Sequence, residues 1–106
     1  DGKNIFLVSN RGYFVNLDKM SGKIIFSSNI LKVLKKKKQN TYVTGFIMGS
    51  GKVYATTLNG YLIVSSATSG NIINFKKLKD QISANPIISN GSLYILTENS
   101  RILGFN

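Results

Sequence analysis

Short apolar runs separated by polar turns extend along the whole chain. Residues 52–75, KVYATTLNGYLIVSSATSGNIINF, are typical of three strands joined by two turns. Asn59-Gly60 favours a type I′ hairpin, because both central residues of that turn need positive φ. The polar run 65–70 ends in glycine and predicts a longer hairpin closed through a left-handed residue. The same pattern predicts ten strands, at residues 5–8, 13–17, 23–27, 41–48, 53–57, 61–65, 71–76, 86–89, 93–97 and 101–105.

This pattern is an internal repeat. Residues 5–26 are an earlier copy of the segment 52–75, with Gly12 in the place of Gly60, and a shorter copy begins at Leu93. A repeat of this length is stronger evidence for a fold than any local pattern. The residues expected to form the turns of the three copies are Gly12, Gly22, Asn59, Gly60, Gly70, Asn90 and Gly91.

One connection, residues 29–40 with the sequence NILKVLKKKKQN, does not follow the repeat. Gly60 follows Gly12 by 48 residues but Asn99 follows Asn59 by 40, so the extra residues fall here. Its apolar residues predict one side of a short helix, with lysines opposite. A run of lysines is usually a solvated loop or helix end. Because this run stands outside the repeat, it is also the candidate partner-binding site, at Lys35, Lys36, Lys37 and Lys38.

Several predicted strands are apolar on both faces, at residues 23–26, 61–64 and 93–96. A sheet with one solvated face would alternate, so each small sheet is expected to lie between two neighbours. Four-stranded units repeating at this spacing describe propeller blades, whereas a β-sandwich, the structural alternative, predicts no such period. The predicted fold class is therefore all-β: a partial β-propeller of about two and a half four-stranded antiparallel blades. It forms one domain, 1–106, with units at about 1–40, 41–80 and 81–106.

The repeat resembles that of the PQQ-type β-propellers, which carry a pattern like G-x-V-Y-x-x-x-x-x-G-x-L-x-x-L-D-x-x-T-G-x-x-x-W. The second unit matches this pattern at Gly51, Val53, Tyr54, Gly60, Leu62, Ser69 and Gly70. The first unit matches at Gly12, Leu17, Asp18, Ser21, Gly22 and Phe26. The third copy matches at Leu93, Tyr94 and Ile102.

The resemblance implies one of two groups. Quinoprotein dehydrogenases bind pyrroloquinoline quinone and calcium and dock their blades through tryptophans, but this chain has no tryptophan and holds Phe26 and Asn74 at that position. The non-enzymatic, BamB-like scaffold branch is therefore the better match. It implies the C-terminal part of a protein-binding propeller for outer-membrane-protein assembly, periplasmic or outer-membrane-associated. The β-barrel assembly machinery is the implied partner, and a dehydrogenase fragment is the alternative.

The composition excludes several kinds of functional site. Cysteine and histidine are absent, so thiolate metal sites and histidine-based triads are excluded. The four acidic residues have no calcium-site spacing, and no catalytic, cofactor-binding or metal site is expected; these residues are Asp1, Asp18, Asp80 and Glu98. Asp18 is expected to cap the turn that ends at Gly22. The repeated tyrosines are expected in the core, at Tyr13, Tyr54, Tyr61 and Tyr94.

The net charge of +10 favours either an anionic partner or a simple lysine bias. The alternative function is therefore binding of an anionic membrane or of nucleic acid through the run Lys35–Lys38. Nucleic acid is the less favoured of these two partners, because lysine outnumbers arginine, the better base-reading residue. A partial propeller also leaves its terminal faces uncovered, so either remaining blades or self-association is expected to bury them. The apolar residues expected on those faces are Ile24, Phe26, Ile95 and Leu103.

Overall fold

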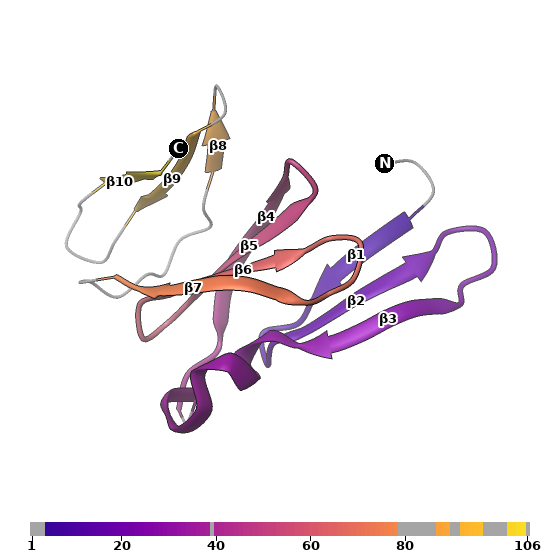
Figure 1. The fold of residues 1–106 in the computed structure, drawn as a ribbon, viewed down its shortest axis with the longest axis horizontal. Helices are drawn as coiled ribbons and strands as arrows, with labels where there is room; N and C mark the ends of the chain where they lie inside the picture. The colour runs from indigo at the N-terminus through magenta and orange to yellow at the C-terminus, as the bar shows by residue number, and fades with distance from the viewer. Residues whose placement is uncertain (1–3, 39, 79–86, 90–91, 97–101, 106) are drawn as a thin grey trace.

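The computed structural model describes residues 4–38, 40–78, 87–89, 92–96 and 102–105, with the backbone alone given for residues 36–38 and for most of the chain after residue 86 (Figure 1). All ten predicted strands are present, with ends within about two residues of those predicted. The strands are β1 (Asn4–Val8), β2 (Tyr13–Asp18), β3 (Ile24–Asn29), β4 (Val43–Gly49), β5 (Lys52–Thr57), β6 (Tyr61–Ser66), β7 (Ile72–Lys77), β8 (Ile87–Ser89), β9 (Ser92–Leu96) and β10 (Ile102–Phe105).

The strands form three antiparallel sheets, which confirms the all-β prediction. The first sheet has the order β1-β2-β3, the second β4-β5-β6-β7 and the third β10-β9-β8. By the repeat, β1, β2 and β3 correspond to β5, β6 and β7. In the second sheet, β5 pairs with β4. Among the described residues, the first sheet has no counterpart of β4, so the equivalent edge of β1 has no strand paired to it.

The turn at Asn59-Gly60 is not the predicted type I′ turn. Three residues separate β5 from β6, and the Gly60 N–H donates to the Thr57 carbonyl at 3.0 Å. Gly60 has φ 88°, but Asn59 is not among the residues with positive φ. A type I turn followed by a left-handed glycine fits this three-residue loop. The two-residue turn with positive φ at both positions is instead Ser50-Gly51, between β4 and β5.

The two copies of the repeat close their turns with the same backbone hydrogen bonds. The Gly12 N–H donates to Ser9 O at 3.0 Å, as Gly60 does to Thr57. The Ile30 N–H then donates to Gly12 O, and the Leu78 N–H donates to Gly60 O in the second copy. The predicted turn roles of Gly12, Gly22, Gly60 and Gly70 are confirmed, since all four have positive φ. Asn90 and Gly91 lie outside the described residues.

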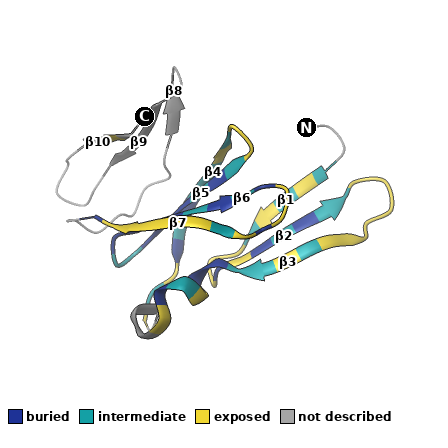
Figure 2. Cartoon of the chain, viewed as in Figure 1, coloured by how far each residue is buried: buried dark blue, intermediate teal, exposed yellow. Residues whose placement is uncertain are grey.

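The core lies where the first sheet packs face to face on the second. Phe14 of β2 is fully buried and belongs to one apolar cluster with Val53, Ala55 and Ile63 of the second sheet. Burial is concentrated on β2, β5 and β6, whereas β3 and β7 have no fully buried residue (Figure 2). The inner strands of the first and second sheets thus supply the core, and their outer strands form the rim.

The irregular connection becomes a 3-10 helix, η1 (Ile30–Lys38), that closes one end of the core. Ile30, Leu31 and Leu34 are buried in the same cluster as Phe14, which confirms the predicted apolar side. The Leu31 N–H donates to the Asn29 side chain at 3.0 Å and so begins the helix. Lys35 has φ 55° and interrupts it.

Three expectations about burial are wrong. Tyr13 was expected in the core but is exposed on the first sheet, while Tyr61 is buried. The apolar run at residues 23–26 was expected to be covered on both faces, yet Ile24 and Ile25 are exposed, and the exposure of Ile24 agrees with the expectation that this residue lies on an uncovered face. Phe26 was expected on the same uncovered face, but it packs against the core cluster, edge-on to Phe14 with ring centroids 5.1 Å apart. The side chains of Tyr94, Ile95 and Leu103 lie outside the described residues.

Candidate protein-binding edge

The outer edge of β7 is the clearest surface for a partner. β7 is the last strand of a sheet that already has four strands, so its second edge has no ladder partner within the described residues. Its side chains from Ile73 to Lys77 are all exposed. An open strand edge presents unpaired N–H and C=O groups to any extended chain. Sequence reasoning did not single out this strand, because an edge position is a property of the assembled sheet.

The backbone of β7 shows which way one of its amides points. The Phe75 N–H donates to the Asn74 side-chain oxygen at 2.8 Å. An amide bonded to its neighbour's side chain is not part of the ladder with β6, so this N–H lies on the open edge. Asn74 therefore partly covers the edge at one point, and a bound strand would displace it.

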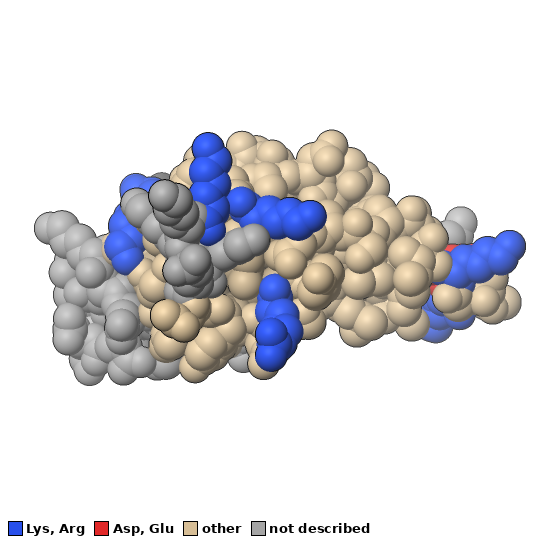
Figure 3. Space-filling view, turned by 90° about the horizontal axis from the view of Figure 1, so that it is seen from below, with Lys and Arg blue, Asp and Glu red and all other residues tan. Residues whose placement is uncertain are grey.

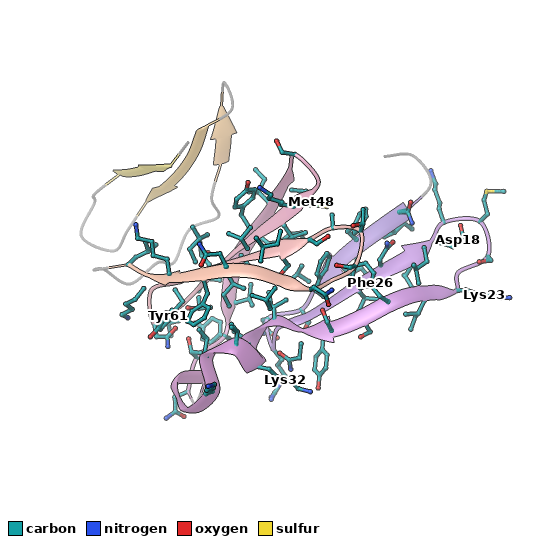
Figure 4. All side chains as sticks on the ribbon, viewed as in Figure 1. Asp18, Lys23, Phe26, Lys32, Met48 and Tyr61 are labelled. Carbon is teal, nitrogen blue, oxygen red and sulfur yellow. The ribbon has the colours of Figure 1, made fainter. Side chains whose placement is uncertain are left out.

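Aromatic and basic groups lie beside this edge. The rings of Phe75 and Tyr61 are 6.3 Å apart. The Lys77 ammonium lies 5.0 Å from the centre of the Tyr61 ring and donates to the Asn59 carbonyl. Figure 4 shows Tyr61 near this end of the second sheet. The edge thus combines open backbone groups, an apolar ring and positive charge, which suits an extended segment with apolar and acidic residues.

Contacts between the sheets fix the start of β7. A Cβ placed on Gly70 would lie 2.7 Å from the Phe26 ring, so β3 packs directly against the turn before β7 (Figure 4). The Ser28 hydroxyl donates to the Gly70 carbonyl at 3.0 Å. Phe26 stands where the family pattern has tryptophan. The position of the edge therefore depends on the first sheet.

Asp18 caps its turn as predicted. Its carboxylate accepts the Met20 N–H at 3.3 Å and the Ser21 hydroxyl at 2.7 Å. The hydroxyl of Ser21 and the Met20 amide hold the pKa of Asp18 below its usual 3.8. These hydrogen bonds give the Asp18 carboxylate a structural role in its turn.

The predicted lysine site is only partly described. Lys35 is exposed, and the side chains of Lys36, Lys37 and Lys38 lie outside the described residues. Figure 3 shows basic side chains at several points on the lower face and a second group at the end where β2 and β3 join. Whether the lysine run binds a partner stays a prediction.

One shallow hollow lies between the first turn and the start of β4. Its volume is about 570 Å³, and its walls are Asn10, Arg11, Asn40, Thr41 and Tyr42. The Val43 N–H donates to Asn10 O at 2.7 Å beside it. Among the described residues of this lining, Arg11 is the one charged side chain and no nucleophile–base pair is present, so the hollow suits a polar or anionic group.

Metal-binding clusters and membrane-spanning helices are both absent from the described residues. Among the described residues, no three histidine, cysteine, aspartate or glutamate side chains come together as a metal-binding group. No helix in the described part of the chain has the length and apolar character needed to span a bilayer.

Comparisons with known proteins bear on the fold. No family model and no curated protein matches the sequence. BamB from Moraxella catarrhalis is 16% identical, with a TM-score of 0.67, over 99% of this chain and 31% of its own. The β-propeller domain of Cps50 (Swd1) from Myceliophteria thermophila is 13% identical, with a TM-score of 0.77, over 98% of this chain and 35% of its own. A europium-containing methanol dehydrogenase is 17% identical, with a TM-score of 0.66, over 90% of this chain and 18% of its own.

These likenesses show the fold. The chain forms part of a β-propeller and spans only about a third or less of the propeller proteins that it resembles. Both a dehydrogenase and BamB share the fold, so function has to be argued from this chain's own surfaces.

Proposed function

We propose that the chain is part of a non-catalytic propeller scaffold that binds extended protein segments along β7. The observation that carries this proposal is the open edge of a completed four-stranded sheet, with the Phe75 N–H turned away from the ladder. An extended segment that adds to such an edge gains backbone hydrogen bonds in register. The exposed Lys76 and Lys77 favour a segment with acidic residues.

The repeat's resemblance to the BamB-like branch extends the proposal to cellular role. It supports a place in outer-membrane-protein assembly, in the periplasm or at the outer membrane, with the β-barrel assembly machinery as partner. The shared fold with BamB is consistent with this role and with others.

A peptide-binding experiment tests the edge. The probe is a short synthetic peptide that alternates valine and threonine, with glutamate at both ends, and binding is followed by fluorescence anisotropy. Phe75→Pro removes the outward N–H without removing a ladder hydrogen bond, so the protein should fold and binding should fall by about tenfold or more. The matched control is Ser27→Pro, at the equivalent position of β3, which should leave binding unchanged.

A second variant keeps the proposal testable if Phe75→Pro does not fold. Asn74→Ala frees the Phe75 N–H and should tighten binding. No binding by the natural chain, or equal binding by Phe75→Pro, would remove the proposal.

The dehydrogenase alternative has its own test. Calcium and pyrroloquinoline quinone are added and the melting temperature is measured. A rise of several degrees would favour a cofactor-binding fragment over the scaffold.

A further inference from the structure

The turn between β2 and β3 carries the most exposed large apolar side chain of the described residues. Met20 is 91% exposed, and Ile25 of β3 is 53% exposed. Lys19 precedes Met20 and Lys23 follows the turn, and both lysines are exposed. Figure 4 shows Lys23 at the outer end of this hairpin. Residues 19–25, the hairpin tip, therefore present apolar side chains beside positive charge.

The second copy of the repeat shows that exposure belongs to these positions. Its equivalent residues are exposed too, and they are Thr68, Asn71 and Ile73, in the places of Met20, Lys23 and Ile25. The second sheet is packed on the first through a shared core, yet it leaves these three residues in solvent. The exposure of the tip is therefore a property of the hairpin and does not depend on what covers the faces of the first sheet.

The second copy also shows that the turn does not require lysine or methionine. The Gly22 N–H donates to Asp18 O at 2.8 Å. In the second copy the Gly70 N–H donates to Ser66 O at 2.9 Å, so both turns close in the same way. The second copy does so with uncharged residues, which are Ala67, Thr68 and Asn71 in the places of Lys19, Met20 and Lys23. The basic and apolar residues of the tip are thus available for a role other than folding.

The one acidic residue beside the tip is engaged within the turn. The Asp18 carboxylate accepts the Ser21 hydroxyl at 2.7 Å and the Met20 N–H at 3.3 Å. Two lysines against this one carboxylate leave the hairpin end positive, with the same sign as the chain's net charge of +10. Charge of that sign draws the tip toward an anionic partner.

We propose that the hairpin tip binds the surface of an anionic phospholipid bilayer by inserting Met20 among the headgroups. Apolar side chains of a surface-bound element enter the boundary between headgroups and acyl chains. Lysine stems follow them while the ammonium groups stay at the level of the lipid phosphates. Nucleic acid or an acidic peptide would pair with Lys19 and Lys23 but would give Met20 no apolar layer to enter. Membrane binding therefore accounts for the methionine as well as for the lysines.

The tip is separate from the other surfaces described above. It includes no residue of β7 and none of the lysine run of η1, and Figure 1 shows it at one end of the molecule. The proposal therefore does not rest on the proposed function.

A single tryptophan reports insertion, because the natural chain has none. Met20→Trp is mixed with vesicles of equimolar phosphatidylcholine and phosphatidylglycerol, and its emission should shift to the blue as the ring leaves water. Vesicles of phosphatidylcholine alone should give little shift, because the lysines then lack an anionic partner. The matched control is Met48→Trp, at the chain's other methionine, which lies on β4 and is 36% exposed. Its emission should not shift with either vesicle.

Co-sedimentation with the anionic vesicles measures the contribution of each side chain. Met20→Thr should weaken binding by about fivefold, because the apolar side chain is lost. The pair Lys19→Ala and Lys23→Asn should weaken binding by about tenfold, and added salt should weaken binding of the natural chain. All three changes install the residue of the second copy, so the turn should fold, and circular dichroism checks that it does.

The charge control is the pair Lys32→Ser and Lys35→Ser. It removes the same charge from exposed positions of η1 and should leave binding within about twofold of the natural chain. An equal loss in this control would assign binding to the net charge or to the lysine run rather than to the tip.

Three further outcomes would overturn the proposal. The natural chain does not bind the anionic vesicles; or folded Met20→Thr binds them as tightly as the natural chain does; or Met20→Trp shows no blue shift when bound. If polyglutamate shifts the emission of Met20→Trp and the vesicles do not, the tip binds an acidic protein and the membrane proposal is wrong.

Discussion

The first and second sheets are two copies of one repeat in different surroundings. Both place a tyrosine after a left-handed glycine, at Tyr13 and Tyr61, and both hold that tyrosine's N–H at 3.0 Å from a hydroxyl oxygen, of Ser9 and Thr57. Only Tyr61 is buried. The local sequence determines the strand, the turn and the face, whereas burial depends on whether another sheet is stacked on that face.

The largest expected effect comes from the long turns, at Gly70 and its equivalent Gly22. Both have positive φ, at 77° and 73°, but only Gly70 faces a ring, that of Phe26. Gly70→Val should destabilise by about 3–5 kcal/mol, because backbone strain and a steric clash act together. Gly22→Val should cost about 1–2 kcal/mol, from strain alone. Urea unfolding measures both, and equal costs would show that the two sheets do not pack at Gly70.

The tyrosine pair is expected to give an effect of similar size. Tyr61→Ala should destabilise by about 3–5 kcal/mol, because it leaves a cavity in the core. Tyr13→Ala should cost less than about 1 kcal/mol in dilute protein. Thermal unfolding of the two variants measures the difference, and similar costs would contradict the assigned exposure.

A smaller effect is expected in the pH dependence of stability, which should differ between the turn at Asp18 and the equivalent turn at Ser66. Asp18 and Ser66 are equivalent, and each accepts backbone N–H groups of its turn, but only Asp18 is charged. Since folding lowers the pKa of Asp18 below 3.8, its contribution to stability is present above that pH and is lost as pH falls through the lowered pKa. Asp18→Ser should leave stability at neutral pH nearly unchanged and reduce the loss in acid. Urea unfolding at neutral pH and at about pH 3 checks this, and an unchanged acid loss would contradict it.

The smallest effect is expected at the lysines of the connection between the sheets. Replacing Lys36 and Lys37 with serine should change stability by less than about 0.5 kcal/mol, because lysine runs are usually solvated. Leu34→Ala, on the buried side of the same helix, should cost about 2–5 kcal/mol. Chemical denaturation compares them, and a reversed order would show that the lysine side anchors the helix.

Sequence predicted the strands, the turn glycines and the apolar side of η1, because these depend on local pattern. It predicted the wrong turn type at Asn59-Gly60, because three residues rather than two separate β5 from β6 and only Gly60 has positive φ. It also placed Tyr13 in the core, because repetition of a residue does not reveal which copies have a neighbour. The open edge of β7 was missed for the same reason, since it depends on the strand order.

The measurement that tests the account most directly is the reactivity of Tyr13 and Tyr61 toward tetranitromethane in dilute protein, with each site followed by peptide mass spectrometry. The account predicts fast nitration of Tyr13 and strong protection of Tyr61, since one repeat position is exposed in the first sheet and buried in the second. Equal rates at the two sites, or faster nitration of Tyr61, would contradict the face-to-face stacking of the two sheets.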